Sequence, residues 1–451
     1  MRGLRSTLVL LVVALGLGGY IFFFERHRPP ASESEPNEQL FDFEADDVAE
    51  LRVDAGEDAV TELRRTDGAW QVVAPVQAAA DDSATSSIAS TLASLEVQRI
   101  VEEGPVDLEP FGLAEPALDV GFTLADADAP RRLLIGDQTP TGGDRYAKLG
   151  DSDRVFLIAG YLNSTFDKST FDLRDKTVLD FERGDLDGLE IAAGDRVIRF
   201  VQDGDDWQIV EPLAAGADFS TVEGLIGSLS NGRMRSVESE SADALESFGL
   251  AEPAISVVLG AGSASATLHV GDETEDGARY ARDASRPLVF TIDASLVTSL
   301  EREAAEYRRK GLFAFRSFSA TRLEVERPDG TVVFEKVEAE TEEEEDAWHR
   351  TEPGSAEVPR ADMDNLLSQV SVLRAESFVA SRADAGLGPE QVAATIRARF
   401  GEDGTEEQVT VWRSGEDTYA VRGDESGAGH IDSQAFDAAL DALEALQDSQ
   451  M

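Results

Sequence analysis

The sequence predicts an α+β protein, in which an N-terminal transmembrane helix is followed by three tandem repeats. Each repeat is expected to be a largely antiparallel sheet with one main helix. Three observations support this prediction: an uncharged stretch at the N-terminus, a motif that returns after 137 residues, and short apolar runs bounded by turn residues. The length of 451 residues corresponds to about three domains, in agreement with three repeats.

The composition excludes several classes of function. With 40 basic and 89 acidic residues, the chain carries a formal net charge of −49. Because such a chain is repelled by phosphate backbones, nucleic-acid binding is not expected. We interpret the acidity mainly as a solvated surface, with steering of a partner by an acidic face as the alternative. There is no cysteine, which excludes disulfides, thiolate catalysis and sulfur-ligated metals.

The N-terminus is predicted to anchor the chain in a membrane. Residues 1–5 form a short cytoplasmic tail, and the 19 residues from Ser6 to Phe24 carry no charge. As a helix this run would be about 28 Å long, close to the thickness of the hydrocarbon core. Cleavage of a signal peptide near Gly19 is the alternative, but it would leave an exposed aromatic N-terminus starting at Tyr20. Residues 25–39 are rich in Pro, Ser and Glu and are expected to be a linker.

One motif defines the repeats. The seven residues that start at Phe111 return unchanged from Phe248, and a divergent third copy starts at Ala385. In the second copy, a helix over residues 241–248 would end with Gly249 in the left-handed conformation, and Leu250 would fold back over Leu245 in a Schellman motif. The third copy has an arginine, Arg382, where this leucine stands, so we expect a weaker cap there.

The remaining elements recur in the same order in repeats 1, 2 and 3, assigned to residues 40–177, 178–311 and 312–451. Each repeat opens near a phenylalanine and continues with a tryptophan-containing strand, a helix with apolar residues on one face, the glycine-capped turn and further strands. We interpret the three repeated tryptophans as core residues and not as a ligand site. The landmarks are Phe43, Phe181 and Phe315 for the opening, and Trp70, Trp207 and Trp348 for the strand.

These residues resemble the bacterial family catalogued as domain of unknown function 4340. The resemblance rests on the anchor and on segments that start at Phe41, Trp70, Phe111, Ile135, Arg145 and Phe171. It covers repeat 1 fully and repeat 2 well, whereas repeat 3 has diverged. It implies a membrane-anchored protein that is accessory to ABC-transporter permeases or to gliding-motility-type systems. No catalytic residue follows from it.

The search for chemistry predicts no catalytic, cofactor-binding or metal-binding residue. The four histidines lie in different parts of the chain and share no close spacing: His27, His269, His349 and His430. Asp137 and Asp272 occupy matching positions after glycine, where a turn explains them better than catalysis. Arg174 and Lys176 are interpreted as partners of nearby acids, or else as a docking site. The acidic run from Glu342 to Asp346 is expected to be a solvated loop, with loose binding of divalent cations as the alternative.

The predicted function is that of a non-catalytic scaffold or binding protein, anchored in the membrane and accessory to an ABC-type transport or envelope system. The expected location is the bacterial inner (cytoplasmic) membrane, crossed once, with the N-terminus inside and the body in the periplasm. The expected partners are the membrane, through residues Ser6 to Phe24, and subunits of the transporter. The alternative is a carboxylate-dependent hydrolase that acts on an envelope polymer.

Overall fold

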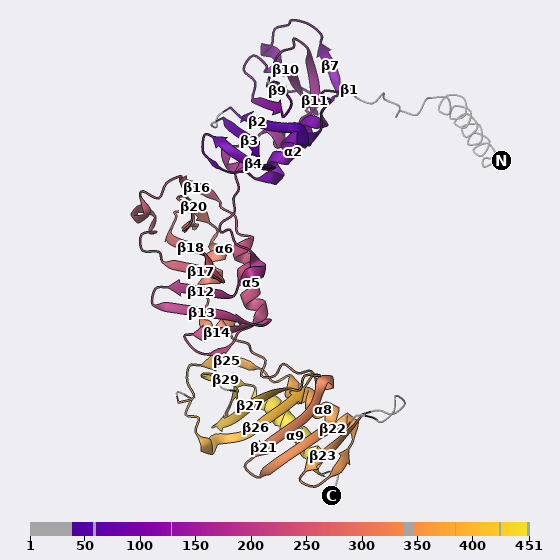
Figure 1. Cartoon of the computed structure of the whole chain (residues 1–451), viewed down its shortest axis with the longest axis vertical. Coiled ribbons are helices and arrows are strands. Elements are labelled where there is room, and N and C mark those ends of the chain that lie inside the picture. Colours follow the sequence, from indigo (N-terminus) through magenta and orange to yellow (C-terminus); the bar gives the residue numbers. More distant parts are fainter. Residues whose placement is uncertain are drawn as a thin grey trace, which may run out of the picture. The chain divides into compact units, whose positions relative to one another are not determined.

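The computed structural model describes residues 38–56, 60–127, 129–337, 339, 346–383, 385–423 and 425–448. These residues form three nine-stranded antiparallel sheets, one in each repeat (Figure 1). The predicted transmembrane helix at residues 6–24, the tail before it and most of the linker lie outside the described residues. Among the residues that are described, no helix is long and apolar enough to cross a membrane.

The first sheet has the order β5-β4-β3-β2-β8-β9-β10-β11-β7. A separate pair joins β1 (Glu38–Gln39) to β6 (Glu96–Val97). The helices are α2 (Asp82–Ala93), α3 (Asn163–Phe166) and α4 (Thr170–Leu173), with 3₁₀ turns η2 (Ala45–Asp47), η3 (Glu109–Phe111) and η4 (Gly160–Leu162). The strands of the sheet are β2 (Val48–Asp54), β3 (Thr61–Thr66), β4 (Ala69–Ala74), β5 (Ala78–Ala79), β7 (Arg99–Glu102), β8 (Leu118–Leu124), β9 (Arg131–Gln138), β10 (Asp144–Leu149) and β11 (Val155–Ala159).

The second sheet follows the same order, β15-β14-β13-β12-β17-β18-β19-β20-β16. Its helices are α5 (Phe219–Ser230), α6 (Ala294–Leu300) and α7 (Ala304–Tyr307), with η5 (Arg183–Asp185) and η6 (Leu245–Phe248). Its strands are β12 (Gly188–Ala193), β13 (Arg196–Asp203), β14 (Asp206–Glu211), β15 (Ala215–Gly216), β16 (Ser236–Ser239), β17 (Ile255–Ala261), β18 (Ala264–Glu273), β19 (Arg279–Asp283) and β20 (Val289–Ile292).

The third sheet again has this order, β24-β23-β22-β21-β26-β27-β28-β29-β25. Its helices are α8 (Arg360–Ser371) and α9 (Ser433–Asp448), with η7 (Ser317–Ser319) and η8 (Pro389–Gln391). Its strands are β21 (Ala320–Arg327), β22 (Gly330–Val337), β23 (Ala347–Glu352), β24 (Ala356–Val358), β25 (Ala375–Val379), β26 (Val392–Phe400), β27 (Thr405–Ser414), β28 (Asp417–Arg422) and β29 (Ala428–Ile431).

The predicted fold class, α+β with one main helix per repeat, is wrong for the described chain; the transmembrane helix of that prediction falls outside the described residues. The described chain is mostly β-sheet, and each repeat holds more than one helix. The sequence underestimates the share of β-structure because edge strands of two or three residues, such as β5 and β15, are too short to show an alternating pattern. The predicted helix over residues 241–248 is also wrong, because only its last four residues form the 3₁₀ turn η6.

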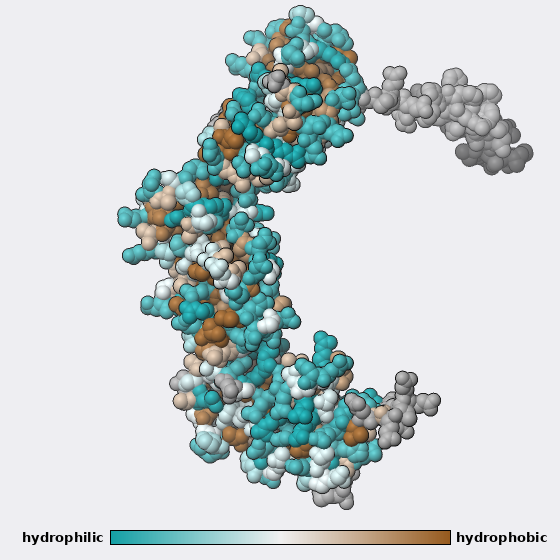
Figure 2. All heavy atoms as spheres, viewed as in Figure 1, coloured by the Kyte–Doolittle hydropathy of each residue, from teal (hydrophilic) through white to brown (hydrophobic). Residues whose placement is uncertain are grey.

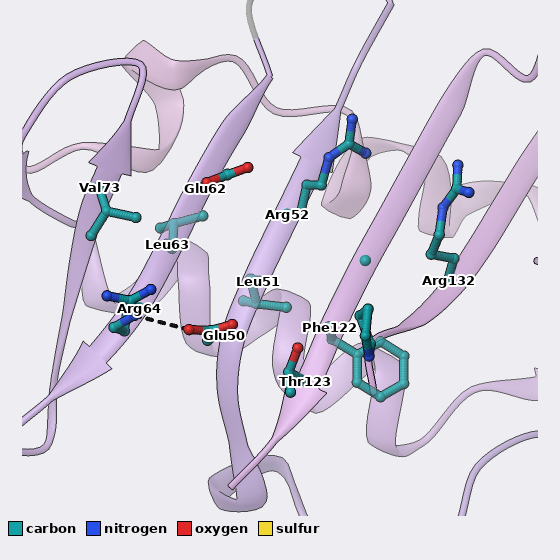
Figure 3. A pocket seen from close by; sticks show the side chains of 12 residues that line it. Glu50, Leu51, Arg52, Glu62, Leu63, Arg64, Val73, Phe122, Thr123 and Arg132 are labelled. Atoms are coloured by element: carbon teal, nitrogen blue, oxygen red, sulfur yellow. Dashed lines mark hydrogen bonds and ion pairs between the residues drawn. The ribbon is translucent and has the colours of Figure 1, made fainter. Parts of the chain in front are cut away.

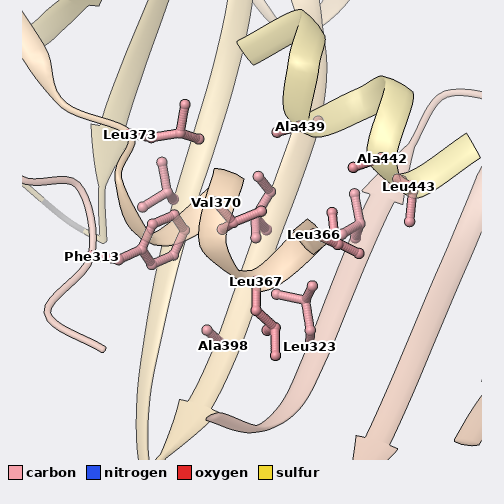
Figure 4. Packing of buried hydrophobic residues seen from close by; sticks show 14 of the residues in the cluster. Phe313, Leu323, Leu366, Leu367, Val370, Leu373, Ala398, Ala439, Ala442 and Leu443 are labelled. Atoms are coloured by element: carbon pink, nitrogen blue, oxygen red, sulfur yellow. The ribbon is translucent and has the colours of Figure 1, made fainter. Parts of the chain in front are cut away.

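Each repeat buries its own core between one face of the sheet and the helices. The three repeated tryptophans are at most 4% exposed, which confirms their prediction as core residues. In repeat 3, Figure 4 shows Leu366 of α8 and Leu443 of α9 packed over Leu323 of β21. The α2 helix is capped at its N-terminus by Asp81, whose side chain accepts a hydrogen bond from the Ala84 N–H at 3.0 Å.

By packing, the chain divides into two compact units, one ending at Lys176 and one beginning at Thr177. The first holds the sheet of repeat 1, and the second holds the sheets of repeats 2 and 3. Hydrophilic side chains cover most of the visible surface, as Figure 2 shows, which fits the excess of acidic residues.

Candidate functional site

The residues that recur in repeats 1 and 2 assemble into one contact between a turn and a strand. Gly112 has a φ of 62°, and the Leu113 N–H donates to the Leu108 carbonyl at 3.1 Å, which is the bond of the predicted Schellman motif. Gly136 lies directly beneath this turn, since a Cβ added to it would be 2.2 Å from the Phe111 carbonyl oxygen. The Phe-Gly-Leu and Gly-Asp motifs therefore recur together because each glycine allows the other segment to approach.

Two further side chains of repeat 1 hold this contact in place. The Arg145 guanidinium donates from Nη1 to the Gly136 carbonyl at 2.8 Å. The ring of Tyr146 packs edge to face on Phe111, with centroids 5.0 Å apart. Arg145 and Tyr146, at the start of the β10–β11 hairpin, thus belong to the same cluster as the turn.

Repeat 2 reproduces the cluster with the same contacts. A Cβ on Gly271 would lie 2.1 Å from the Phe248 carbonyl oxygen, and Arg279 donates from Nε to the Gly271 carbonyl at 2.9 Å. The Phe248 and Tyr280 rings are again 5.0 Å apart. We refer to this arrangement as the turn–strand cluster.

The structure places Asp137 and Asp272 against this turn and not in a cleft. A Cβ added to Gly112 would lie 2.5 Å from the Asp137 Cγ, and a Cβ added to Gly249 would lie 2.5 Å from the Asp272 Cγ. Each carboxylate therefore occupies the space that the missing glycine side chain leaves. The two carboxylates lie in different sheets, each in the same position within its own repeat.

Repeat 3 solves the same packing problem with a different side chain. The position of Gly136 is taken by Trp412, since Ile135 pairs with Ala147 as Val411 pairs with Ala420. Trp412 is 7% exposed and packs in a small cluster with Leu387 of the third turn. The Leu387 N–H still donates to the Arg382 carbonyl at 2.9 Å, so the hydrogen bond of the cap forms here as well.

Arg174 and Lys176 lie where the chain leaves repeat 1. Arg174 is 5% exposed and forms an isolated β-bridge with Ala80 beside the edge strand β5. The Lys176 ammonium donates to the Asp172 carbonyl at 2.9 Å and lies 5.4 Å from the centre of the Phe171 ring. Backbone carbonyls and an aromatic ring hold Lys176, and its charge also acts on the nearby Asp172 carboxylate.

In repeat 2 the position of Arg174 is taken by Arg308, which the sequence did not single out. Arg308 forms a β-bridge with Ala217, its guanidinium lies 4.0 Å above the centre of the Phe378 ring, and it pairs with Glu425 at 3.4 Å. Burial lowers the pKa of Arg308, while Glu425 opposes this change. The other Glu425 oxygen accepts the Gly216 N–H at 3.0 Å, so one ion pair joins the second sheet to the third. The signal in the sequence was the repeated arginine, two residues before a lysine.

The three histidines that the structure describes lie on three different strands. His269 lies in β18, and burial followed by the neighbouring Arg282 lowers its pKa. His349 lies in β23, and His430 lies in β29, where its Nε2 is 3.3 Å from Asp417 and its Nδ1 is 3.8 Å from Glu376. Within the described part of the chain, no group of three or more His, Asp or Glu side chains is placed to hold a metal ion. His27 and the acidic residues 342–345 lie outside that part.

An open hollow lies on the outer face of the first sheet (Figure 3). It has a volume of about 560 Å³ and extends across strands β2, β3, β8 and β9. At one end Arg64 pairs with Glu50 at 2.9 Å, and at the other end Arg52 reaches Asp119 at 3.2 Å. Arg132 bonds to the same aspartate. Because these arginines are already paired with carboxylates, the hollow has the chemistry of a surface for contacts and not that of a reaction site.

The outer faces of repeats 1 and 3 carry the same kind of cross-strand pair with the charges exchanged. Glu50 lies opposite Arg64 in repeat 1, whereas Arg322 lies opposite Glu335 at the matching positions of repeat 3. The latter two groups are 2.7 Å apart. Exchanging the positive and negative residue of a pair preserves the attraction between the two strands. It changes the pattern of surface charge on that face of the sheet.

The fold and these surfaces define a tandem-repeat protein of antiparallel sheets, in which the most repeated residues stabilise each repeat. The chain belongs to the family described as Domain of unknown function (DUF4340), whose model matches residues 70–206 and 207–391. Both matched segments begin at a repeated tryptophan, so each covers parts of two successive sheets. No curated protein and no solved structure matched the chain.

Proposed function

We propose that this protein is a non-catalytic scaffold or binding protein of the bacterial envelope, accessory to an ABC-type transport or similar envelope system. Its hydrophobic segment from Ser6 to Phe24 attaches it to the inner membrane, and its body lies on the periplasmic side. The attachment and the location rest on the sequence, and the accessory role rests on the family resemblance.

The observation that supports the proposal is that the repeated residues contact one another and stabilise the fold. Gly112, Gly136 and Arg145, with their counterparts in repeat 2, all serve the turn–strand cluster that stabilises these two repeats. What differs between repeats is the outer face, where the charge pairs exchange sign. A shared framework with different exposed faces is typical of repeat proteins that bind several partners or one extended partner.

The location can be tested with an introduced cysteine, because the chain has none of its own. The variant Glu402→Cys places a thiol on an exposed turn of repeat 3. We expect a membrane-impermeant maleimide to label this thiol once the outer membrane is made permeable, without lysis of the inner membrane. Labelling that occurs only after lysis would contradict a periplasmic body.

The binding role is tested by purification of the tagged full chain from detergent-solubilised membranes, followed by quantitative mass spectrometry. We expect transporter subunits to be enriched over a mock purification from cells that express the tag alone. Absence of any enriched membrane protein, or degradation of an envelope polymer by the purified chain, would contradict the proposal.

A further inference from the structure

The chain segment that links the second and third sheets lies beside two hollows. Arg308 pairs with Ala217 of the second sheet, and Gly311 pairs with Arg374, just before β25 of the third sheet. The hollows have volumes of about 510 Å³ and 430 Å³. Both are lined by Lys310, Arg374 and the Val372–Leu373 segment between α8 and β25. We call this region the linker hollow.

Arg374 and its counterpart in the segment between the first and second sheets have different surroundings. That counterpart, Arg233, forms a β-bridge with Thr177 and donates from Nη1 to the threonine hydroxyl at 2.7 Å. At the linker hollow the threonine position is taken by Gly311, which has no hydroxyl to accept the bond. Arg374 is exposed, and its side chain makes no ion pair or hydrogen bond within the described residues.

Lys310 has lost its partner in the same way. Its counterpart Lys176 lies 5.4 Å from the centre of the Phe171 ring and donates to two backbone carbonyls. Three residues before Arg308, at the position of Phe171, the chain has Ala305. Lys310 is exposed and has no side-chain partner in the part of the chain that the structure describes.

The residue at the end of the helix changes from polar to apolar. The C-cap residues of the helices α2 and α5 are Ser94 and Asn231, whose side chains donate back to the Ser90 and Gly227 carbonyls at 2.8 Å each. The C-cap residue of α8 is instead Val372, which is 62% exposed. The exposed apolar side chain at this position is available to pack against a binding partner.

The acidic side chains that line the two hollows keep their charge but accept local hydrogen bonds or face a histidine; Glu306 accepts the Glu303 N–H at 3.3 Å. Asp218 caps α5 through the Thr221 N–H at 2.9 Å, and Asp432 accepts the Gln434 N–H at 2.8 Å. Glu376 faces His430 at 3.8 Å. Among the side chains that line the hollows, Lys310 and Arg374 are therefore the cations without a partner in the described residues, and the neighbouring carboxylates reduce the positive charge that a ligand meets.

We propose that the linker hollow binds an acidic peptide segment of a partner protein, with carboxylates on Lys310 and Arg374 and an apolar side chain on Val372. This surface deepens the proposed binding role and rests on it. The net charge of −49 opposes acidic partners at long range, but salt screens that repulsion beyond about 8 Å. An acidic peptide would be attracted to Lys310 and Arg374 and repelled by the acidic surface elsewhere. The negative charge of the chain would therefore help to restrict binding to this hollow.

The test uses the full chain in detergent micelles and fluorescein-labelled peptides of about eight residues. One peptide alternates Glu with Leu and the other alternates Gln with Leu. Fluorescence anisotropy should show binding of the Glu peptide that weakens with added salt, and at least tenfold weaker binding of the Gln peptide. The double variant Lys310→Ala/Arg374→Ala should lose at least about tenfold in affinity for the Glu peptide, and Val372→Ser about fivefold.

The matched control is Lys176→Ala/Arg233→Ala, which removes the two counterpart cations and changes the net charge by the same amount. It should bind the Glu peptide as the wild type does, with circular dichroism verifying that all variants are folded. The proposal is overturned if the wild type does not bind the Glu peptide, if the Gln peptide binds equally well, or if both double variants lose affinity alike. These results would leave the partner capture from membranes standing, so failure of this surface is distinguishable from failure of the binding role.

Discussion

At the scale of residues, glycine positions decide how closely two segments approach. Gly136 and Gly271 have backbone carbonyls where a Cβ would be, at 2.2 Å and 2.1 Å. A backbone oxygen cannot move aside as the end of a flexible side chain can. The turn–strand cluster therefore depends on the absence of a single carbon atom, which explains why both motifs return unchanged in repeat 2.

The variant Gly136→Ala should destabilise repeat 1 by about 2 kcal/mol, because its Cβ overlaps the Phe111 carbonyl and the turn must shift. Gly143→Ala is the matched control, since a Cβ there meets nothing within 4 Å. Urea unfolding of both variants and the wild type measures the difference. If the two variants were equally stable, the close approach of turn and strand would not be the reason for the motif.

At the scale of elements, the sheets are stabilised on the inner face by apolar packing and on the outer face by charge pairs. On β21, Glu324 lies 2.8 Å from Arg322 and 2.6 Å from Arg397 of the neighbouring strand β26. The hydrogen bond from Arg322 lowers the pKa of Glu324; burial opposes this effect and Arg397 reinforces it. Such a group stabilises the fold above its ordinary pKa, and the stabilisation is lost as the pH falls through the lowered pKa.

The variant Glu324→Gln should therefore lower the free energy of unfolding by about 0.5 to 1 kcal/mol at neutral pH. The difference from the wild type should shrink as the pH falls below about 4.5, the ordinary pKa of a glutamate, because the wild-type carboxylate becomes protonated. Urea unfolding across this pH range provides the measurement. The control is Glu402→Gln, in an exposed turn; an equal change in the control, or a difference that does not depend on pH, would contradict the assigned ion pairs.

At the scale of the molecule, the chain segment between the second and third sheets is bound to both repeats by backbone hydrogen bonds. The Arg309 N–H donates to the Gly216 carbonyl at 2.9 Å, and the Leu312 N–H donates to the Leu373 carbonyl at 3.0 Å. Arg308, which is 3% exposed, pairs across this connection with Glu425, in the loop between β28 and β29 of repeat 3. The two sheets therefore share a bonded connection, in agreement with their place in one compact unit.

The variant Glu425→Ala should reduce stability by about 2 kcal/mol, because it leaves the buried Arg308 guanidinium without its carboxylate. Hydrogen exchange of the Arg309 and Leu312 amides, followed by mass spectrometry, should become faster. Glu416→Ala, in a turn of the same sheet, should leave both amides as protected as in the wild type. Unchanged exchange in the Glu425 variant would show that the ion pair does not hold the linker.

The sequence alone determined the repeats, their tryptophan cores and the glycine-capped turns, because these depend on local spacing and on the conformational freedom of single residues. It identified the family correctly. It did not determine the fold class, since short edge strands have no period and acquire their pairing only from neighbouring strands. It also missed Arg308 and the linker hollow, because the partners of Arg308, Lys310 and Arg374, or the lack of them, depend on residues far away in the chain. Only the tertiary structure, which brings Glu425 to Arg308 across 117 residues, decides which charges are paired and which stay available.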